Sequence, residues 1–239
     1  MSTLDAKIAH TVALLSQTAQ QFSPAVFANS LGAEDMVITD LIARHQLAIE
    51  IFSLDTGRLP AETYNLLADA HQRYTSHPIT VYFPQTEATE NYVRTHGING
   101  FYDSIDSRKA CCAVRKIEPL RRALKDKKAW ITGLRREQSP TRQDLTDQAF
   151  DDDNGLWKIS PLLDWTEKEV WEYLRANNVP YNALHDRHYP SIGCAPCTRA
   201  ISIGEDVRAG RWWWENPDSK ECGLHVSSSV SALKPKAQA

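Results

Sequence analysis

The feature that most constrains the fold is a repeated alternation of short apolar runs with stretches of helical periodicity. Apolar runs of strand type lie at residues 25–28, 48–54, 79–83 and 128–133. Amphipathic helices are expected at 4–21, 36–44, 60–74 and 167–177. Because strands that alternate with helices form parallel sheets, we expect an α/β protein whose parallel sheet has helices on both faces.

Polar loops follow three of these strands and contain Ser30, Asp55 and Arg135. The carboxyl ends of parallel strands meet at one edge of a sheet, where ligands bind. The loop from Ser30 to Asp35 also precedes a helix, and free N–H groups at a helix N-terminus attract anions. An ordinary turn explains this loop equally well by itself, so the prediction of a site depends on the convergence of all three loops.

Length and composition favour one domain with a tail. The chain has 239 residues, of which 42% are hydrophobic, and a net charge of −3. We expect an α/β domain over residues 1–205 and a mobile C-terminal tail over residues 206–239. The weak negative charge argues against a general nucleic-acid binder.

The start has no apolar signal core and no run approaches 18 apolar residues, so the sequence predicts a cytoplasmic protein without membrane contact.

Four of the five cysteines form two close groups, Cys111-Cys112 and Cys194-x-x-Cys197. Thiolates held near one another are ligands for soft metals, whereas a disulfide would need an oxidising compartment. An adjacent pair is a poor zinc knuckle, so the spacing favours an iron–sulfur site while leaving zinc open. The remaining Cys222 follows an arginine-rich segment, a setting that holds a thiol as the reactive thiolate.

Arginines and histidines near these cysteines suggest an anionic ligand. Arg199, Arg208 and Arg211 precede a run of three tryptophans, and arginine forks match the oxygens of phosphate and sulfate. His225 lies three residues after Cys222, where it can bind an anion or adjust thiol ionisation. His185 and His188 are expected to be loop residues, and the helix at 167–177, which opens with a capping box, is expected to carry no chemistry.

Five segments together resemble the assimilatory sulfonucleotide reductases. They are Cys111–Leu120, Gly133–Ser139, Gly193–Arg199, Gly210–Glu215 and Lys220–His225. The resemblance extends over roughly residues 25 to 225. Its Glu-Cys-Gly-Leu-His element is shared by the whole family. The paired cysteines mark the branch that reduces adenosine 5′-phosphosulfate (APS), and the branch that uses the 3′-phosphorylated form (PAPS) typically lacks them.

The resemblance implies an adenine-nucleotide α-hydrolase-like fold and a [4Fe-4S] cluster bound by Cys111, Cys112, Cys194 and Cys197, which decides for iron–sulfur over zinc. The loop from Ser30 to Asp35 takes the place of the Ser-Gly-Gly-x-Asp-Ser pyrophosphate loop of related ATP-cleaving enzymes. It departs from that loop at Leu31 and Asp35. A glycine for close phosphate approach is missing, which argues against ATP cleavage.

The resemblance further implies thioredoxin-dependent reduction of APS to sulfite and AMP, in sulfate assimilation, through an S-sulfonate on the catalytic Cys222. The expected substrate-binding residues are Ser30, Leu54, Lys116, Gly133, Arg142, Arg208, Arg211 and His225. No sixth cysteine is present to release sulfite, so the reductant must be a separate protein. The alternatives are a PAPS or dual-substrate reductase and a non-catalytic iron–sulfur or zinc regulator; whether the chain is a homo-oligomer stays open.

Overall fold

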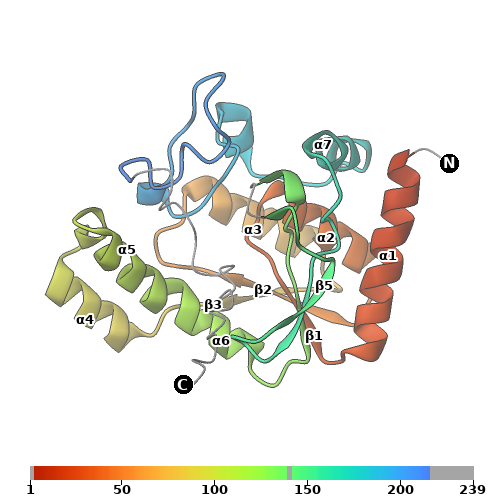
Figure 1. The fold of residues 1–239 in the computed structure, drawn as a ribbon, viewed down its shortest axis with the longest axis horizontal. Helices are drawn as coiled ribbons and strands as arrows, with labels where there is room; N and C mark the ends of the chain where they lie inside the picture. Colours follow the sequence, from red (N-terminus) through yellow and green to blue (C-terminus); the bar gives the residue numbers. More distant parts are fainter. Residues whose placement is uncertain (1–2, 139–141, 216–239) are drawn as a thin grey trace, which may run out of the picture.

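The protein is an α/β sandwich built on one sheet, as a computed structural model that describes residues 3–138 and 142–215 shows (Figure 1). The strands are β1 (Ala25–Ala28), β2 (Ile49–Leu54), β3 (Ile79–Tyr82), β4 (Ala129–Ile131), β5 (Gln148–Asp151) and β6 (Leu156–Ile159). The α-helices are α1 (Thr3–Gln21), α2 (Ala33–Arg44), α3 (Ala61–Arg73), α4 (Thr86–His96), α5 (Ile105–Cys112), α6 (Glu118–Leu124) and α7 (Glu167–Ala176).

Within these residues the six strands form one sheet in the order β3-β2-β1-β4-β6-β5. Five strands are mutually parallel, and β5 pairs antiparallel with β6 at the edge. The chain therefore runs outward from β1 through β2 to β3 and then crosses back to β4 on the other side of β1. Such a reversal of direction opens a crevice at the carboxyl ends of β1 and β4, which is where open α/β sheets bind ligands.

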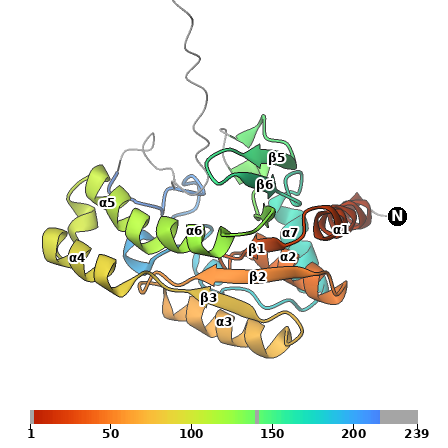
Figure 2. The same cartoon turned by 90° about the horizontal axis from the view of Figure 1, so that it is seen from below.

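The period-2 alternation of the strands divides the core into two layers. Phe27 of β1 packs in the large cluster that includes side chains from α1, α2, α3 and α7. Its neighbour Val26 points to the other face, where it meets Leu120 and Leu124 of α6. Figure 2 shows α3 and α6 on opposite sides of β2 and β3. The prediction of helices on both faces of a largely parallel sheet is confirmed.

Two details of the predicted fold are wrong. The sheet is not wholly parallel, because the unpredicted hairpin of β5 and β6 adds an antiparallel edge. Its turn contains Asn154-Gly155, with Gly155 at a φ of 70°, a sequence typical of tight hairpins. In addition, α2 begins at Ala33 rather than Met36, because Gly32 caps the helix. The helix start therefore lies directly beside the loop after β1.

The residues from 206 to 215 lie against the segment that contains Cys194 and Cys197. Arg211 forms an isolated antiparallel bridge with Thr198, and the Trp212 backbone N–H donates to the Cys197 carbonyl oxygen at 3.2 Å. The boundary between a domain and a tail after residue 205 stays a prediction. No helix in the described part of the chain is both long and apolar enough to cross a membrane.

Candidate functional site

A cavity of about 300 Å³ opens at the carboxyl ends of β1, β2 and β4. It lies at the sheet edge where the sequence predicts converging loops. Its wall includes seven of the predicted substrate-binding positions, namely Ser30, Leu54, Lys116, Gly133, Arg142, Arg208 and Arg211. The eighth, His225, and the predicted nucleophile Cys222 lie outside the described residues. The tertiary fold thus brings together positions that are as many as 181 residues apart, from Ser30 to Arg211.

The loop after β1 is held by its own side chains. The backbone N–H and the hydroxyl of Ser30 each donate to Oδ2 of Asp35 at 2.6 Å. The backbone N–H of Leu31 donates to Oδ1 of Asn29, also at 2.6 Å. Leu31 has a φ of 63°, in the left-handed region that favours glycine, and its side chain is buried in the core. The loop therefore keeps a glycine-like turn although it carries leucine there.

Asp35 connects this loop to the loop after β4. Its carboxylate is buried and also accepts a backbone hydrogen bond from Gly133. A Cβ atom on Gly133 would lie 2.1 Å from Oδ1 of Asp35, so only glycine permits this contact. Burial raises the pKa of Asp35 to about 7, and the bonds from Ser30 lower it in part. The sequence indicated the loop but not the contact between Asp35 and Gly133.

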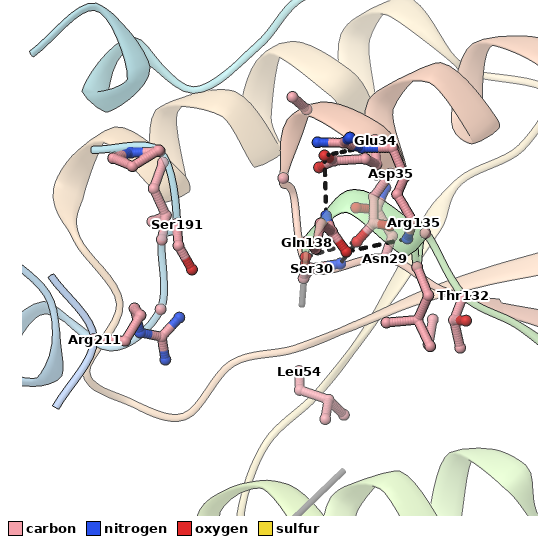
Figure 3. Close-up of a pocket in the computed structure, with 18 of the residues that line it drawn as sticks. Asn29, Ser30, Glu34, Asp35, Leu54, Thr132, Arg135, Gln138, Ser191 and Arg211 are labelled. Carbon is pink, nitrogen blue, oxygen red and sulfur yellow. Dashed lines mark hydrogen bonds and ion pairs between the residues drawn. The ribbon is translucent and has the colours of Figure 1, made fainter. Parts of the chain in front are cut away.

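A polar network follows Asp35 along the same wall of the cavity (Figure 3). Nε of Arg135 pairs with Oε1 of Glu34 at 2.8 Å, and Nε2 of Gln138 donates to the same oxygen at 3.0 Å. Nη1 of Arg142 in turn donates to Oε1 of Gln138. Arg135 was recognised in the sequence as a loop residue, whereas Glu34 and Gln138 were not proposed as site residues. The sequence feature that could have identified Glu34 and Gln138 is that each lies in or next to a loop that follows a strand.

The opposite wall is basic and carries Arg211 (Figure 3). Arg211 is 8% exposed, and its guanidinium lies over the Trp212 ring at 4.9 Å. Within residues 3–138 and 142–215, Arg211 has no carboxylate partner and its buried Nε has no hydrogen-bond partner. A Cβ atom on Gly193 would meet the Arg211 guanidinium at 2.3 Å, so this glycine leaves the space it occupies. A buried guanidinium without an acidic partner is suited to an anionic ligand.

The four predicted cluster cysteines surround a second, smaller cavity. Cys111, Cys112, Cys194 and Cys197 all line it, together with Arg58, Arg108, Arg115, Lys116, Arg211 and Trp212. The hydroxyl of Thr56 lies 3.2 Å from Sγ of Cys194, and Nη1 of Arg115 donates to the Thr56 carbonyl oxygen at 2.7 Å. A π-helical turn, Ala113–Ile117, follows the adjacent cysteine pair; such widened turns occur frequently at functional sites.

The chemistry of this second cavity fits an iron–sulfur cluster. Burial raises the pKa of Cys111, and it raises the pKa of Cys197 to about 12, while nearby cations oppose both shifts. Within the described ranges no three His, Cys, Asp or Glu side chains are grouped as ligands of one metal ion. The four thiols are nevertheless of the chemical type that binds iron–sulfur clusters.

A buried ion pair anchors the end of the described chain beside these cysteines. Arg108 of α5 donates to Glu215 through Nε at 2.5 Å and through Nη2 at 2.9 Å. The Arg108 guanidinium also lies over the Trp212 ring at 4.6 Å. Glu215 stands seven residues before Cys222 in the sequence. The pair therefore attaches the segment that leads to the predicted nucleophile to the helix that carries two of the cysteines.

From the sequence, no chemistry was assigned to two further residues that line the large cavity. Trp171 of α7 packs against the core and also contributes to the cavity wall. His185 packs edge-on against Trp171 with ring centroids 5.2 Å apart, and burial lowers the pKa of His185. His185 lies in a short 3-10 helix, Ala183–Arg187, and not in the expected loop. Periodicity misses such residues because a helix that packs on the core can still reach a cavity at its end.

The capping box predicted for α7 is confirmed, since the Thr166 side chain accepts from the Glu169 backbone N–H and the Glu169 carboxylate accepts from the Thr166 backbone N–H. Unlike His185, His188 is exposed and does not line the cavity.

Residues 24–200 match the phosphoadenosine phosphosulfate reductase domain family. An adenosine 5′-phosphosulfate reductase from Allochromatium vinosum is 57% identical over 93% of this chain and 87% of its own length. One from Burkholderia cepacia is 51% identical over 99% and 94%. A crystal structure of phosphoadenylyl-sulfate (PAPS) reductase from Candida auris, a phosphate complex, matches with a TM-score of 0.69 at 25% identity, covering 84% of this chain and 98% of that one. This match confirms the fold that the resemblance predicts.

Proposed function

Because this chain belongs to the phosphoadenosine phosphosulfate reductase domain family, we propose that it reduces APS to sulfite and AMP. Relatives that share 51–57% of its sequence are named for APS, whereas the PAPS reductase of known structure shares 25%. APS is therefore the proposed substrate in preference to PAPS. We place the reaction in sulfate assimilation and in the cytoplasm, where cysteine thiols stay reduced.

One observation carries the proposal: the two cavities share a wall. Lys116, Cys194, Arg211 and Trp212 line both the large cavity and the cysteine cavity. An anion bound in the large cavity against Lys116 and Arg211 would therefore lie next to the cysteines. An anion site beside the cysteines is expected of a reductase that acts on an anionic nucleotide, whereas a regulator that only senses redox state has no use for one.

The residues of the second cavity support the proposed cofactor. Cys111, Cys112, Cys194 and Cys197 would hold a [4Fe-4S] cluster, which supplies a charged iron–sulfur centre beside the substrate. Arg58 and Arg115 add positive charge around these thiols, which favours an anionic cluster there. Replacing any one of the four cysteines with serine should lower iron and acid-labile sulfide content; near-normal iron in all four variants would contradict the assignment.

The large cavity provides separate positions for the two halves of APS. Ser30, Leu54 and Gly133, at the carboxyl ends of β1, β2 and β4, would contact the nucleoside. Lys116, Arg142, Arg208 and Arg211 would bind the phosphosulfate, with His225 added from outside the described residues. Their charges would reduce the repulsion between a thiolate and a dianion and stabilise the leaving phosphate.

Cys222 is the proposed nucleophile. Its thiolate attacks the sulfur of the phosphosulfate, a sulfur–sulfur bond forms as the bond to the bridging oxygen breaks, and AMP leaves with the electron pair. A thiolate of reduced thioredoxin then attacks Sγ of Cys222, and sulfite leaves with the electron pair of that bond. The second thioredoxin thiol restores the Cys222 thiol, so thioredoxin supplies both electrons and ends as a disulfide.

The test is a single turnover without reductant. APS should release AMP in a burst equal to the active sites, and intact-mass analysis should locate one sulfonate on the peptide with Cys222. Cys222→Ser should keep the iron and produce neither burst nor adduct. A full burst from Cys222→Ser, or an adduct on another cysteine, would refute the mechanism. Comparing turnover of APS with that of the 3′-phosphorylated nucleotide tests the choice of substrate.

A further inference from the structure

His185 lines the large cavity, and the proposed reaction gives it no role. Nε2 of its ring is buried and forms no hydrogen bond with any described residue. Among buried side-chain nitrogens and oxygens of the described chain, only one other lacks a partner in this way, and it is Nε of Arg211, on the same cavity. A buried polar atom without a partner is unfavourable, so such an atom on a cavity wall indicates a group that binds a ligand.

The ring of His185 is held in place by neighbouring elements. The short 3-10 helix that contains it is capped by Asn182. Oδ1 of Asn182 accepts from the Leu184 backbone N–H at 3.0 Å, and Nδ2 of Asn182 donates to the Thr63 hydroxyl of α3 at 2.9 Å. The ring itself packs edge-on against Trp171 of α7, with centroids 5.2 Å apart. The position of Nε2 is therefore fixed by contacts with α3 and α7.

The surroundings of His185 make its ring a neutral acceptor. Burial lowers the pKa of His185, so the ring is uncharged at pH 7, although Glu34, Glu167 and a backbone hydrogen bond with Tyr189 oppose the shift. A backbone group that raises a histidine pKa accepts a hydrogen bond from the ring. That bond uses the single proton of the neutral ring, and the unpartnered Nε2 is therefore assigned as an acceptor.

The ligand group that faces this wall should be a neutral hydrogen-bond donor. The carboxylates of Glu34 and Glu167 line the same cavity and would repel a phosphate or a sulfate. The cations that suit those anions, Lys116 and Arg211, lie elsewhere on the cavity wall; Figure 3 shows Glu34 and Arg211 on opposite sides of it. The nucleoside half of an adenylate carries donors of the required kind, namely its ribose hydroxyls and the amino group of adenine.

We propose that His185 is a specificity-determining residue whose Nε2 accepts a hydrogen bond from a donor of the nucleoside. The inference rests on the proposed function and deepens it, since it adds a nucleoside contact from the wall beside α7. This contact is separate from Ser30, Leu54 and Gly133, which lie at the carboxyl ends of the strands. The donor is either a ribose hydroxyl or the adenine amino group, and the experiment separates the two.

The experiment measures binding of AMP and three analogues to the full-length protein by calorimetry. His185→Phe keeps an aromatic ring against Trp171 and removes the acceptor, so AMP affinity should fall roughly three- to tenfold, as expected for one neutral hydrogen bond. His185→Gln, which carries an acceptor near the position of Nε2, should recover part of the loss. Inosine 5′-monophosphate lacks the amino group, and the 2′-deoxy and 3′-deoxy forms of AMP each lack one hydroxyl. The analogue without the recognised donor should bind the native protein and His185→Phe equally.

His188→Asn is the control, because His188 is exposed, lies three residues further along the chain and does not line the cavity. It should bind AMP as the native protein does. Circular dichroism checks the fold of each variant, and His185→Leu replaces His185→Phe if the latter does not fold.

The proposal is overturned if removal of the acceptor leaves AMP affinity unchanged. It is also overturned if affinity for AMP and for all three analogues falls by the same factor, since a role in packing alone would produce that result. Sulfite formation from APS is measured separately. A native protein that binds AMP and forms no sulfite would contradict the proposed function, while the comparison of the variants would still test His185.

Discussion

Helix α2 carries two buried carboxylates that are satisfied in opposite ways. Asp40, in the core, accepts from the Tyr74 hydroxyl at 3.0 Å and the Tyr173 hydroxyl at 2.7 Å, and Nε of Arg44 pairs with it at 2.7 Å. Asp35, at the cavity, has only neutral donors around it in the described chain. On this helix a cation accompanies the carboxylate that lies in the core, and only neutral donors accompany the one that lines the cavity.

The largest expected effect comes from breaking the core network. Asp40→Ala leaves two buried tyrosine hydroxyls without their acceptor and Arg44 without its partner, so it should lower the free energy of unfolding by about 4–5 kcal/mol. Urea denaturation measures this loss. Glu62→Ala, which removes an exposed ion pair with Arg187, should cost less than about 1 kcal/mol. Similar losses in both variants would show that the Asp40 network does not matter for stability.

Asp35, the carboxylate that lines the cavity, should instead make the free energy of unfolding depend on pH. Asp35 keeps its proton up to about pH 7 when folded, against an ordinary pKa of 3.8 in the unfolded chain. The folded state therefore binds the proton more tightly, and the free energy of unfolding falls as pH rises through this window, by about 4 kcal/mol. Asp35→Asn should lack this fall.

Urea denaturation of both proteins across the window checks the sign. The stability of the native protein relative to Asp35→Asn should fall as pH rises from about 4 to about 7. A difference between them that does not change with pH would contradict the assignment of the titration to Asp35.

Substitutions in the basic wall of the cavity should lower ligand affinity rather than the free energy of unfolding. Arg211→Ala removes a buried guanidinium without an acidic partner in the described chain, so APS affinity should fall by about 2–3 kcal/mol. Lys116→Ala should act in the same direction. Calorimetry with APS measures both, and Arg187→Ala, at an exposed ion pair, is the control. Unchanged affinity in both variants would remove these residues from the anion site.

The smallest effect should come from the glycine that contacts Asp35. A Cβ at position 133 would lie 2.1 Å from Oδ1 of Asp35, so Gly133→Ala should displace the carboxylate and lower stability by about 1–2 kcal/mol. At Gly32 the nearest atom is 3.4 Å from such a Cβ, which is ordinary contact, so Gly32→Ala is the matched control. Thermal denaturation compares the two. Equal shifts would show that the approach of Asp35 to Gly133 is not constrained.

Features that depend on near neighbours in the chain can be predicted from the sequence alone. The strand and helix periods predicted β1, β2, β3 and β4 and the helices α1, α2, α3 and α7, but not α4, α5 or α6, since burial of one side chain in two or in three to four is a local pattern. The two groups of cysteines and the Thr166 capping box are likewise readable within a few residues. The edge hairpin was missed because acidic residues obscure its alternation, although Asn154-Gly155 is a local turn signal.

Contacts between distant residues are known only from the folded chain. Asp35 and Gly133 come from separate loops, and Arg108 pairs with Glu215 across 107 residues of sequence. Whether a buried carboxylate receives a cation or a neutral donor is likewise set by the packing of other elements, as Asp40 and Asp35 show on one helix. Spacing along the chain carries no information about such contacts, because they depend on the order in which the strands join the sheet.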